Sequence, residues 1–397
     1  MNKLVKYLKI TLIAILCLSL SLLFVACDKQ VPSVTDFDYM LVVDKVIITG
    51  YNGSDIQVEI PATIDNKEVV AIGDNAFRYN TDITNIKIPN SVKSIGEDAF
   101  YDCKELTKVE FANGSKLTSI GDYAFYNCLS LSDISMPNSL VAIGYYAFYN
   151  CTGLTQITLP NSVEYLAHQA FSQCSNLQNI TIGSGLKSVG EDAFWGCGRL
   201  QKVYITDLSA WCNIDFANAD SNPLNYCLES LYINGTKTTN LVIPADVKQI
   251  KDYAFVYSNI DSLSFAPNSQ LEVIGQNAFE SSELSTVALP QNGKSITIKR
   301  WAFGYCHYLE NIVIPINVEI MEWNVFGGAG VTIVFCEAAS KPAGWSDFGP
   351  VNYAAYYWYS ENTPITEGNY WKYVDGVPII LQSTGPSGIP DGVIGEC

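Results

Sequence analysis

The chain has 397 residues, with 40 acidic side chains against 23 lysines and arginines and a formal net charge of −17 at pH 7. This charge argues against nucleic acid as a partner, because such binding rests on Lys and Arg side chains that contact phosphates. The sequence has only two histidines and no C-x-x-C pair, so it offers no zinc site of the usual kind.

Residues 1–26 are predicted to be a bacterial export signal. A basic start with three lysines precedes a largely apolar run at residues 10–26. The motif FVAC at 24–27 resembles a lipobox, in which the signal is cut before Cys27 and that cysteine is lipidated, although Leu is usual at the first position. Two alternatives to lipidation stay open, simple secretion and an uncleaved anchor helix. The apolar run is of marginal length for such a helix to span a bilayer. In each case we expect the mature chain to face outside the cytoplasm, with residues 27–36 as a polar linker.

Residues 37–69 are predicted to form an N-terminal β cap. The runs at Met40–Ile48 and Ile56–Ile60 alternate between polar and apolar side chains, which is typical of half-buried strands. The residues Tyr51–Ser54 between them read as a turn. We expect this segment to cover the first unit of the repeats that follow.

A repeating unit then occupies residues 70–334. Its mark is an Ala-Phe pair at Ala76-Phe77, Ala99-Phe100, Ala124-Phe125, Ala147-Phe148, Ala170-Phe171, Ala193-Phe194, Ala254-Phe255, Ala278-Phe279 and Ala302-Phe303, with Val325-Phe326 as a variant. Successive Phe positions differ by 23, 25, 23, 23 and 23, then by 61, then by 24, 24 and 23. A fixed period of this length predicts a solenoid, in which each unit buries its apolar face against its neighbours.

One unit, Leu154–Phe171, shows what each part is expected to do. The alternation in Gln156–Leu159 predicts a short strand, which Pro160 ends because proline cannot donate to a β ladder. Val163 and Leu166 are expected to enter the core from the opposite wall. The last part, Ala-Phe-x-x-Cys, has the spacing of one helical turn.

In most units a glycine follows the second apolar slot, at Gly96, Gly121, Gly144, Gly190 and Gly275. A glycine would be required at these positions if the backbone there had a positive φ, or if two backbones approached each other closely. The fold prediction is therefore a mostly β solenoid with units of about 23 residues. Short strands are expected on one wall and short helical or 3-10 turns on the other, with ladders of Phe, of Cys and Leu, and of Ile along the axis.

This repeat resembles the BspA-type, or Treponema pallidum-type, leucine-rich repeat of bacterial surface proteins. The resemblance covers roughly Val70–Val334 and departs from the pattern in the 61-residue interval and where Asn80, Ser258 and Ser282 replace the cysteine. It implies a non-enzymatic surface protein. Proteins of this kind are implicated in adhesion to host extracellular-matrix proteins such as fibronectin and fibrinogen.

The cysteines follow the repeat. Six of them stand three residues after a repeat Phe: Cys103, Cys128, Cys151, Cys174, Cys197 and Cys306. We interpret these as buried free thiols that pack like small apolar side chains. Cys212 and Cys227 lie off this ladder, and a disulfide between them stays open.

The 61-residue interval is predicted to hold an enlarged unit near residues 206–240 and one unit without the Ala-Phe turn. Strands are expected at Lys202–Ile205, Ser230–Ile233 and Asn240–Ile243. A variant of the stack is the favoured interpretation, and a protruding recognition loop is the alternative.

After Phe326 the period stops, and Val331–Phe335 is expected to be the last strand. Residues 335–382 are rich in tryptophan and tyrosine. The favoured role of this segment is an aromatic cap over the end of the core. A glycan-binding platform that uses side chains such as Trp358 and Trp371 is the alternative. Residues 383–397 read as a flexible tail.

No catalytic constellation is evident, because both histidines lie in repeat turns and neither a nucleophile elbow nor a phosphate loop occurs. We therefore predict no enzymatic activity, no cofactor and no metal. The candidate ligand-binding residues are outward positions of the strands: Lys87, Lys108, Glu110, Asp133, Thr158, Thr181, Lys202 and Tyr204.

The predicted function is binding of a macromolecular ligand in the bacterial cell envelope, by a chain that contacts the membrane through its lipid anchor only. A host-matrix protein as the ligand is implied by the resemblance alone. A glycan-binding lipoprotein and an envelope scaffold for other proteins are the alternatives.

Overall fold

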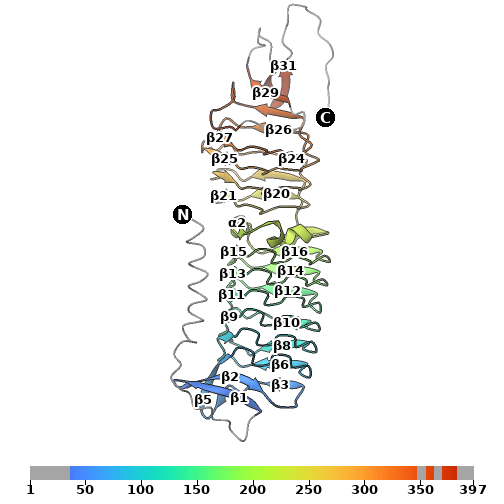
Figure 1. The fold of residues 1–397 in the computed structure, drawn as a ribbon. Helices are drawn as coiled ribbons and strands as arrows, with labels where there is room; N and C mark the ends of the chain where they lie inside the picture. The colour runs from blue at the N-terminus through green and yellow to red at the C-terminus, as the bar shows by residue number, and fades with distance from the viewer. Residues whose placement is uncertain (1–35, 347–354, 362–368, 382–397) are drawn as a thin grey trace, which may run out of the picture.

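The computed structural model describes residues 36–346, 355–361 and 369–381. They form a long column of stacked turns that runs from the N-terminal strands to the C-terminal strands (Figure 1). The prediction of a mostly β solenoid is confirmed. The predicted signal, Cys27 and the predicted tail at 383–397 lie outside the described residues.

The N-terminal strands are β1 (Phe37–Val42), β2 (Lys45–Tyr51), β3 (Gln57–Glu59), β4 (Thr63–Ile64) and β5 (Lys67–Ile72). β1 and β2 form an antiparallel hairpin, and β2 pairs in parallel with β5. The expected run Met40–Ile48 is therefore wrong as one strand. It is divided at Val43, which has a φ of 59° and is fully exposed, a backbone conformation that cannot continue a strand.

One side of the column, here called the strand wall, holds the first strand of each unit, which has two to five residues. Its strands are β3, β6 (Asn85–Ile88), β8 (Lys108–Phe111), β10 (Asp133–Ile134), β12 (Gln156–Leu159), β14 (Asn179–Ile182), β16 (Lys202–Ile205), β18 (Ser230–Ile233), β19 (Thr236–Lys237), β20 (Asn240–Ile243), β22 (Ser262–Phe265), β24 (Thr286–Val287), β26 (Asn311–Ile314), β28 (Ile333–Cys336), β29 (Ala355–Tyr359), β30 (Tyr370–Val374) and β31 (Val377–Leu381). The three strands expected around the 61-residue interval lie where predicted, as β16, β18 and β20. The wall is divided into four sheets, with breaks after β10, β19 and β24.

The second wall consists of the second strand of each unit, which has two to four residues. They are β7 (Ser94–Ile95), β9 (Ser119–Ile120), β11 (Ala142–Ile143), β13 (Tyr165–Leu166), β15 (Ser188–Val189), β17 (Asp215–Phe216), β21 (Gln249–Ile250), β23 (Val273–Ile274), β25 (Ile296–Ile298) and β27 (Val318–Met321). They extend the sheet of β1, β2 and β5 up to β17, and a second sheet begins at β21.

The repeated glycine is required by close backbone approach. A Cβ at Gly121 would lie 2.7 Å from the carbonyl carbon of Gly96, which is backbone and cannot move aside. Neither glycine has a positive φ. Of the two explanations that the sequence left open, steric contact between consecutive units is therefore the correct one.

The Ala-Phe segments form the third side, here called the turn wall. In place of a regular helical turn, each segment has a positive φ both two residues before and two residues after the Phe. In one unit these residues are Asp98 and Asp102, with φ of 56° and 61°. Every second N–H of the segment points along the column to the next unit, and Phe100 N–H donates to the carbonyl of Ala124 at 2.7 Å. The turn wall is thus a hydrogen-bonded ladder of its own.

The core between the walls contains the expected Phe ladder. Phe100, Phe125, Phe148 and Phe171 are fully buried, and consecutive rings lie 5.0 to 5.1 Å apart with interplanar angles of 10° or less. The ladder stops at Phe194 and resumes at Phe255. The interruption divides the column into two parts. The first stack ends with the β18–β19 hairpin, and the second stack begins at β20.

The junction between the stacks, here called the seam, is built by the inserted residues. They form α2 (Leu208–Cys212), β17, the 3-10 turns η1 (Ala219–Ser221) and η2 (Pro223–Tyr226), and the β18–β19 hairpin. These helical segments are the only ones within the described residues. The insertion is thus part of the stack, as the favoured interpretation expected, because Trp211, Cys212, Ile214 and Leu224 all belong to the continuous core.

The C-terminal end differs from the prediction that the last strand is Val331–Phe335. Three strands follow β28, and β29 and β30 extend its sheet in parallel before β31 closes it as an antiparallel hairpin. The turn of this hairpin is Asp375-Gly376, with both residues at positive φ, which is the geometry preferred in two-residue hairpins. The strand wall therefore continues beyond the end of the Phe period.

Candidate functional site

The predicted ligand-binding residues lie on the strand wall, but in two different sheets. Lys87, Lys108, Glu110 and Asp133 belong to the sheet of β3, β6, β8 and β10. The other four, Thr158, Thr181, Lys202 and Tyr204, belong to the sheet that starts at β12. Since β10 does not pair with β12, the hydrogen-bonded ladder is broken between the two groups, which are here called the first and the second patch.

Within the second patch the parallel register aligns the side chains in columns. Thr158 is opposite Thr181, and Thr181 is opposite Tyr204, which in turn is opposite Tyr232. The rings of Tyr204 and Tyr232 lie 4.8 Å apart. The wall thus presents a preorganised polar column with two tyrosines at its end.

The charges of the first patch are largely neutralised by neighbours. Lys87 pairs with Glu59 at 2.7 Å, while Lys108 pairs with Glu110 at 2.7 Å and with Asp133 at 3.4 Å. All these groups are solvent-exposed to a substantial degree, so each pair adds little stability. The pairing leaves no stripe of one sign on this part of the wall.

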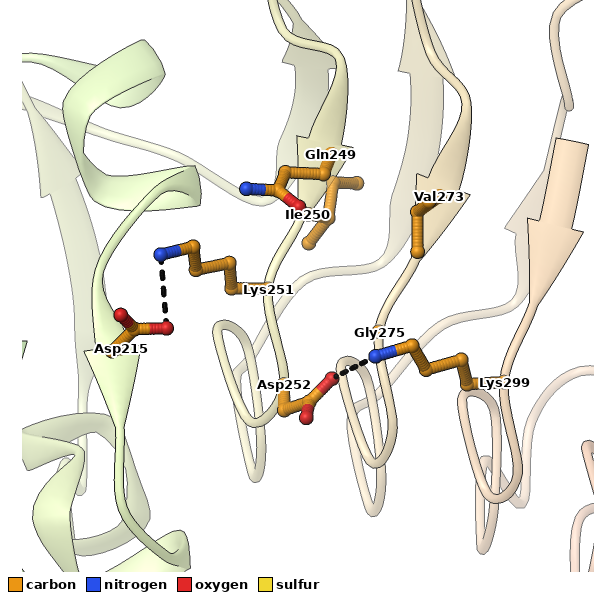
Figure 2. Close-up of a pocket in the computed structure, with 8 residues that line it drawn as sticks. All are labelled: Asp215, Gln249, Ile250, Lys251, Asp252, Val273, Gly275 and Lys299. Atoms are coloured by element: carbon orange, nitrogen blue, oxygen red, sulfur yellow. Dashed lines mark hydrogen bonds and ion pairs between the residues drawn. The ribbon is translucent and has the colours of Figure 1, made fainter. Parts of the chain in front are cut away.

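A groove lies at the seam, where β17 and β21 do not pair. One hollow, of about 130 Å³, is lined by Asp215 of β17, by residues 249–252 in and just after β21, by Val273 and Gly275 in and just after β23, and by Lys299. Figure 2 shows how these side chains lie. The lysines of this hollow are paired, Lys251 with Asp215 at 2.9 Å and Lys299 with Asp252 at 3.2 Å. An adjoining hollow of about 380 Å³ is lined by residues including Asp246, Lys248 and Glu272. Both hollows have a mostly polar lining of mixed charge, to which only Val273, and Ile250 in the smaller hollow, add apolar side chains. Neither hollow therefore has the predominantly apolar lining of a small-molecule site.

The cysteine ladder is buried, as predicted, but its thiols also act as hydrogen-bond donors. Cys151 donates to the carbonyl of Phe125 and Cys174 to that of Phe148, each at 3.1 Å. Cys212 and Cys227 are free thiols, so the disulfide left open between them does not form. In the described ranges no group of His, Cys, Asp and Glu is arranged to hold a metal ion.

Burial raises the pKa of these thiols, to about 12 for Cys103 and Cys174, from the ordinary value of 9.0. A folded-state pKa above the unfolded one means that the unfolded chain loses its protons first as the pH rises. The contribution to stability is therefore complete below about pH 9 and is lost between about pH 9 and 12.

We accordingly expect the free energy of unfolding to fall steadily above about pH 9, as measured by urea denaturation at a series of pH values. The double variant Cys103→Ala, Cys174→Ala should show a shallower fall than the wild-type chain. An identical pH dependence in both proteins would contradict the assignment to the thiols.

The C-terminal aromatics are mostly used for packing. Trp371 is fully buried and donates from its indole nitrogen to the carbonyl of Cys336 at 2.8 Å. Trp345 is also buried and donates to the carbonyl of Val318. Their rings cannot stack on a sugar, so Trp371 is wrong as a glycan-binding residue. Trp358 packs against the core and is half-buried.

The sequence interpretation missed the tyrosines of the turn wall. Tyr123 and Tyr146 precede an Ala-Phe pair by one residue, and Tyr126 and Tyr149 follow it. The motif YAFY, present twice, is the signal that could have found them. The structure brings the four rings together.

Two stacked walls, a ladder of turns and a continuous apolar core define a leucine-rich repeat solenoid. Residues 70–201 and 228–340 match the model of the family described as BspA type Leucine rich repeat region, in six copies. The chain belongs to this family. No curated protein matches it. Within the described residues, no helix is long and apolar enough to cross a membrane.

Several solved structures are similar to the chain. The leucine-rich repeat protein of T. pallidum is 35% identical, with 44% of this chain and 81% of that chain covered and a TM-score of 0.41. The pneumococcal vaccine antigen PcpA is 22% identical, with coverages of 85% and 94% and a TM-score of 0.49. A leucine-rich cell surface protein of Faecalibacterium prausnitzii is 21% identical, with coverages of 77% and 88% and a TM-score of 0.43.

Proposed function

We propose that this chain is a non-enzymatic, lipid-anchored protein of the bacterial cell envelope that binds a protein partner through the side of its solenoid. Membership of a family of bacterial surface proteins and the predicted signal with its lipidated Cys27 support the location. Adhesion to host matrix proteins is implied by the resemblance alone, and it makes such a protein the first ligand to test.

The observation that carries the binding role is the parallel register of the strand wall. Backbone hydrogen bonds hold Thr158, Thr181 and Tyr204 in one column, so an outward surface several units long is ordered before any partner arrives. Preorganisation of this kind lowers the entropy cost of binding. Extended lateral surfaces are also the usual binding surfaces of solenoids.

The absence of catalytic geometry in the described residues is consistent with this role. His168 contacts the hydroxyl of Tyr146 at 3.1 Å, and no serine or cysteine nucleophile is hydrogen-bonded to it in this part of the chain. The cysteines are unsuited to nucleophilic chemistry, because burial raises the pKa of each ladder thiol.

The test is an array of host matrix proteins, host glycans and bacterial glycans, probed with the purified chain 28–397. Saturable binding to a protein that falls in the Lys87→Ala, Lys108→Ala, Tyr204→Ala variant supports the strand wall as the surface. Lys93→Ala, an exposed lysine just before β7, is the matched control and should bind as the wild-type chain does.

The alternatives are outcomes of the same experiment. Binding to a glycan that is lost in Trp358→Ala would favour the glycan-binding lipoprotein. A blank array together with a specific partner captured from the same cells would favour the envelope scaffold. Anchoring is tested by metabolic labelling with a fatty acid, which the wild-type precursor should incorporate and Cys27→Ala should not.

A further inference from the structure

One strand is missing from the second wall at the seam. In an ordinary unit a strand of the strand wall is followed by a strand of the second wall, as β14 is followed by β15. The unit of β18, all of which the structure describes, has no such second strand. Its chain turns back at Asn234-Gly235 into β19 and then enters β20. One sheet of the second wall therefore ends at β17, and the next begins at β21.

The missing strand leaves N–H groups of β21 without their usual acceptors. One unit later, the N–H groups of Glu272 and Val273 both donate to the carbonyl of Lys248, at 2.7 and 3.2 Å. Lys248 and Gln249 hold the same two positions in their own unit, and no backbone acceptor lies against their N–H groups within the described residues. Lys248 is exposed and Gln249 is half-buried. A strand edge with unused donors is a template for pairing with another strand.

The opposite side of the groove has an unused acceptor. In the preceding unit the carbonyl of Val189 accepts a hydrogen bond from Ala217 N–H at 3.1 Å. The corresponding carbonyl of β17 is that of Phe216, and it accepts no backbone hydrogen bond in the part of the chain that the structure describes. Lys251 N–H, the donor that would meet it in a regular ladder, donates instead to the carbonyl of Cys212 at 2.9 Å.

The groove between the two strands widens toward the unused donors. Figure 2 shows the side chain of Lys251 extended across it, and only the Nζ atom reaches Asp215, at 2.9 Å. The hollow of about 130 Å³ is lined by Lys251. The hollow of about 380 Å³ is lined by Lys248 and Gln249 and does not include Lys251. The open space therefore lies against the edge of β21 that has no partner strand.

The lining of the groove favours a main chain over particular side chains as its ligand. Most of the charged groups already have partners: besides the two lysine pairs of the smaller hollow, Glu272 pairs with Lys294 at 3.6 Å, and Asp246 accepts a hydrogen bond from Ser209 at 3.0 Å. The lining is mostly polar, so a ligand gains little from apolar contact. The unused backbone groups remain, and an extended peptide can pair with them by strand addition.

We propose that an extended segment of a protein partner binds in this groove as a β strand and pairs with the free edge of β21. The segment accepts hydrogen bonds from the N–H groups of Lys248 and Gln249. Two to four residues are sufficient, because the strands of the second wall are themselves no longer than that. The inference rests on the proposed function and adds to it a second contact surface and a mode of binding in which the main chain supplies the affinity.

The test uses the chain 28–397 and the fluorescein-labelled peptide Lys-Thr-Val-Thr-Val-Thr-Lys, with binding followed by fluorescence anisotropy. Threonine and valine favour an extended chain, and the lysines suit a protein with a net charge of −17. We expect saturable binding. The same peptide with its five central residues N-methylated keeps every side chain but cannot pair along either edge, so it should bind at least about tenfold more weakly.

Two variants at one position separate the main chain from the side chain. Gln249→Pro removes an N–H that has no backbone acceptor in the described residues, so it should weaken peptide binding about tenfold and leave the melting temperature nearly unchanged. Gln249→Ala is the matched control: it keeps the N–H and should bind as the wild-type chain does. If Gln249→Pro does not fold, the N-methylated peptide still decides the question on the wild-type chain.

Three results would overturn the proposal: no saturable binding of the peptide, equal binding of the methylated and unmethylated peptides, or unchanged affinity in a folded Gln249→Pro variant. These results are distinguishable from the fate of the proposed function. A chain that captures a protein on the array equally well as Gln249→Pro would keep its function and lose this site. A chain that binds the peptide at β21 but captures nothing on the array would keep the site and count against matrix proteins as ligands.

Discussion

Phe148→Ala is expected to lower the free energy of unfolding by about 3–5 kcal/mol. The ring is fully buried and stacks on Phe125 and on Phe171, each at 5.1 Å. Removing it leaves a cavity that the neighbours cannot close, because the backbone ladder fixes the spacing of the units. Urea denaturation followed by circular dichroism measures the loss.

Two variants control this measurement. Phe148→Leu keeps most of the apolar volume and should cost clearly less than alanine. Tyr149→Ala removes a neighbouring ring that is only half-buried, and should also cost less. A loss below about 1 kcal/mol in Phe148→Ala would show that the stack can collapse around the gap, and that the Phe ladder is not the main support of the fold.

The periodic parts of this fold could be predicted because they repeat. Ten Phe positions, spaced by 23 to 25 residues except across the one 61-residue interval, specify stacked units. Alternation within a unit locates its strand, as at Gln156–Leu159. The backbone of the turn wall could not be predicted in the same way. Its positive φ values fall on residues as different as Asp98, Tyr123 and Gln169, because the ladder of backbone hydrogen bonds, and not residue propensity, imposes them.

The candidate surfaces were predictable to different degrees. Outward positions such as Lys87 and Thr158 follow from strand alternation and are exposed. Their charge balance depends on partners in other units, such as Glu59 for Lys87, and this needs the register. The tyrosines Tyr101, Tyr126 and Tyr149 are 23 to 25 positions apart in the sequence but stack side by side on the turn wall, and only the register between units shows this.

The seam was the least predictable part, and Trp211 is its central residue. In ordinary units the N–H of the repeat Phe donates to the carbonyl of the next Ala, as from Phe171 to Ala193 at 2.9 Å. At the seam the indole nitrogen of Trp211 donates to the carbonyl of Ala254 at 2.8 Å. The side-chain amide of Asn222 donates to the same carbonyl at 3.0 Å. Side chains thus replace the missing backbone donor and join the second stack to the first.

Trp211→Ala is therefore expected to do more than remove a large buried side chain. The lost volume should cost on the order of 3–5 kcal/mol. In a solenoid, stability is a sum of unit and interface terms, so a weakened interface lets the two sides unfold separately. We expect one cooperative thermal transition in the wild-type chain and two in the variant, resolved by calorimetry.

Trp211→Phe isolates the hydrogen bond from the volume. It keeps an aromatic ring in the core but leaves the carbonyl of Ala254 with only the amide of Asn222 as a side-chain donor. This variant should lose about 1–3 kcal/mol and keep a single transition. A single transition in Trp211→Ala as well would mean that the remaining contacts of the insertion suffice to couple the stacks. The indole would then not be the group that couples the two stacks. Their coupling would instead depend on the apolar core, which Ile214 and Leu224 continue across the seam.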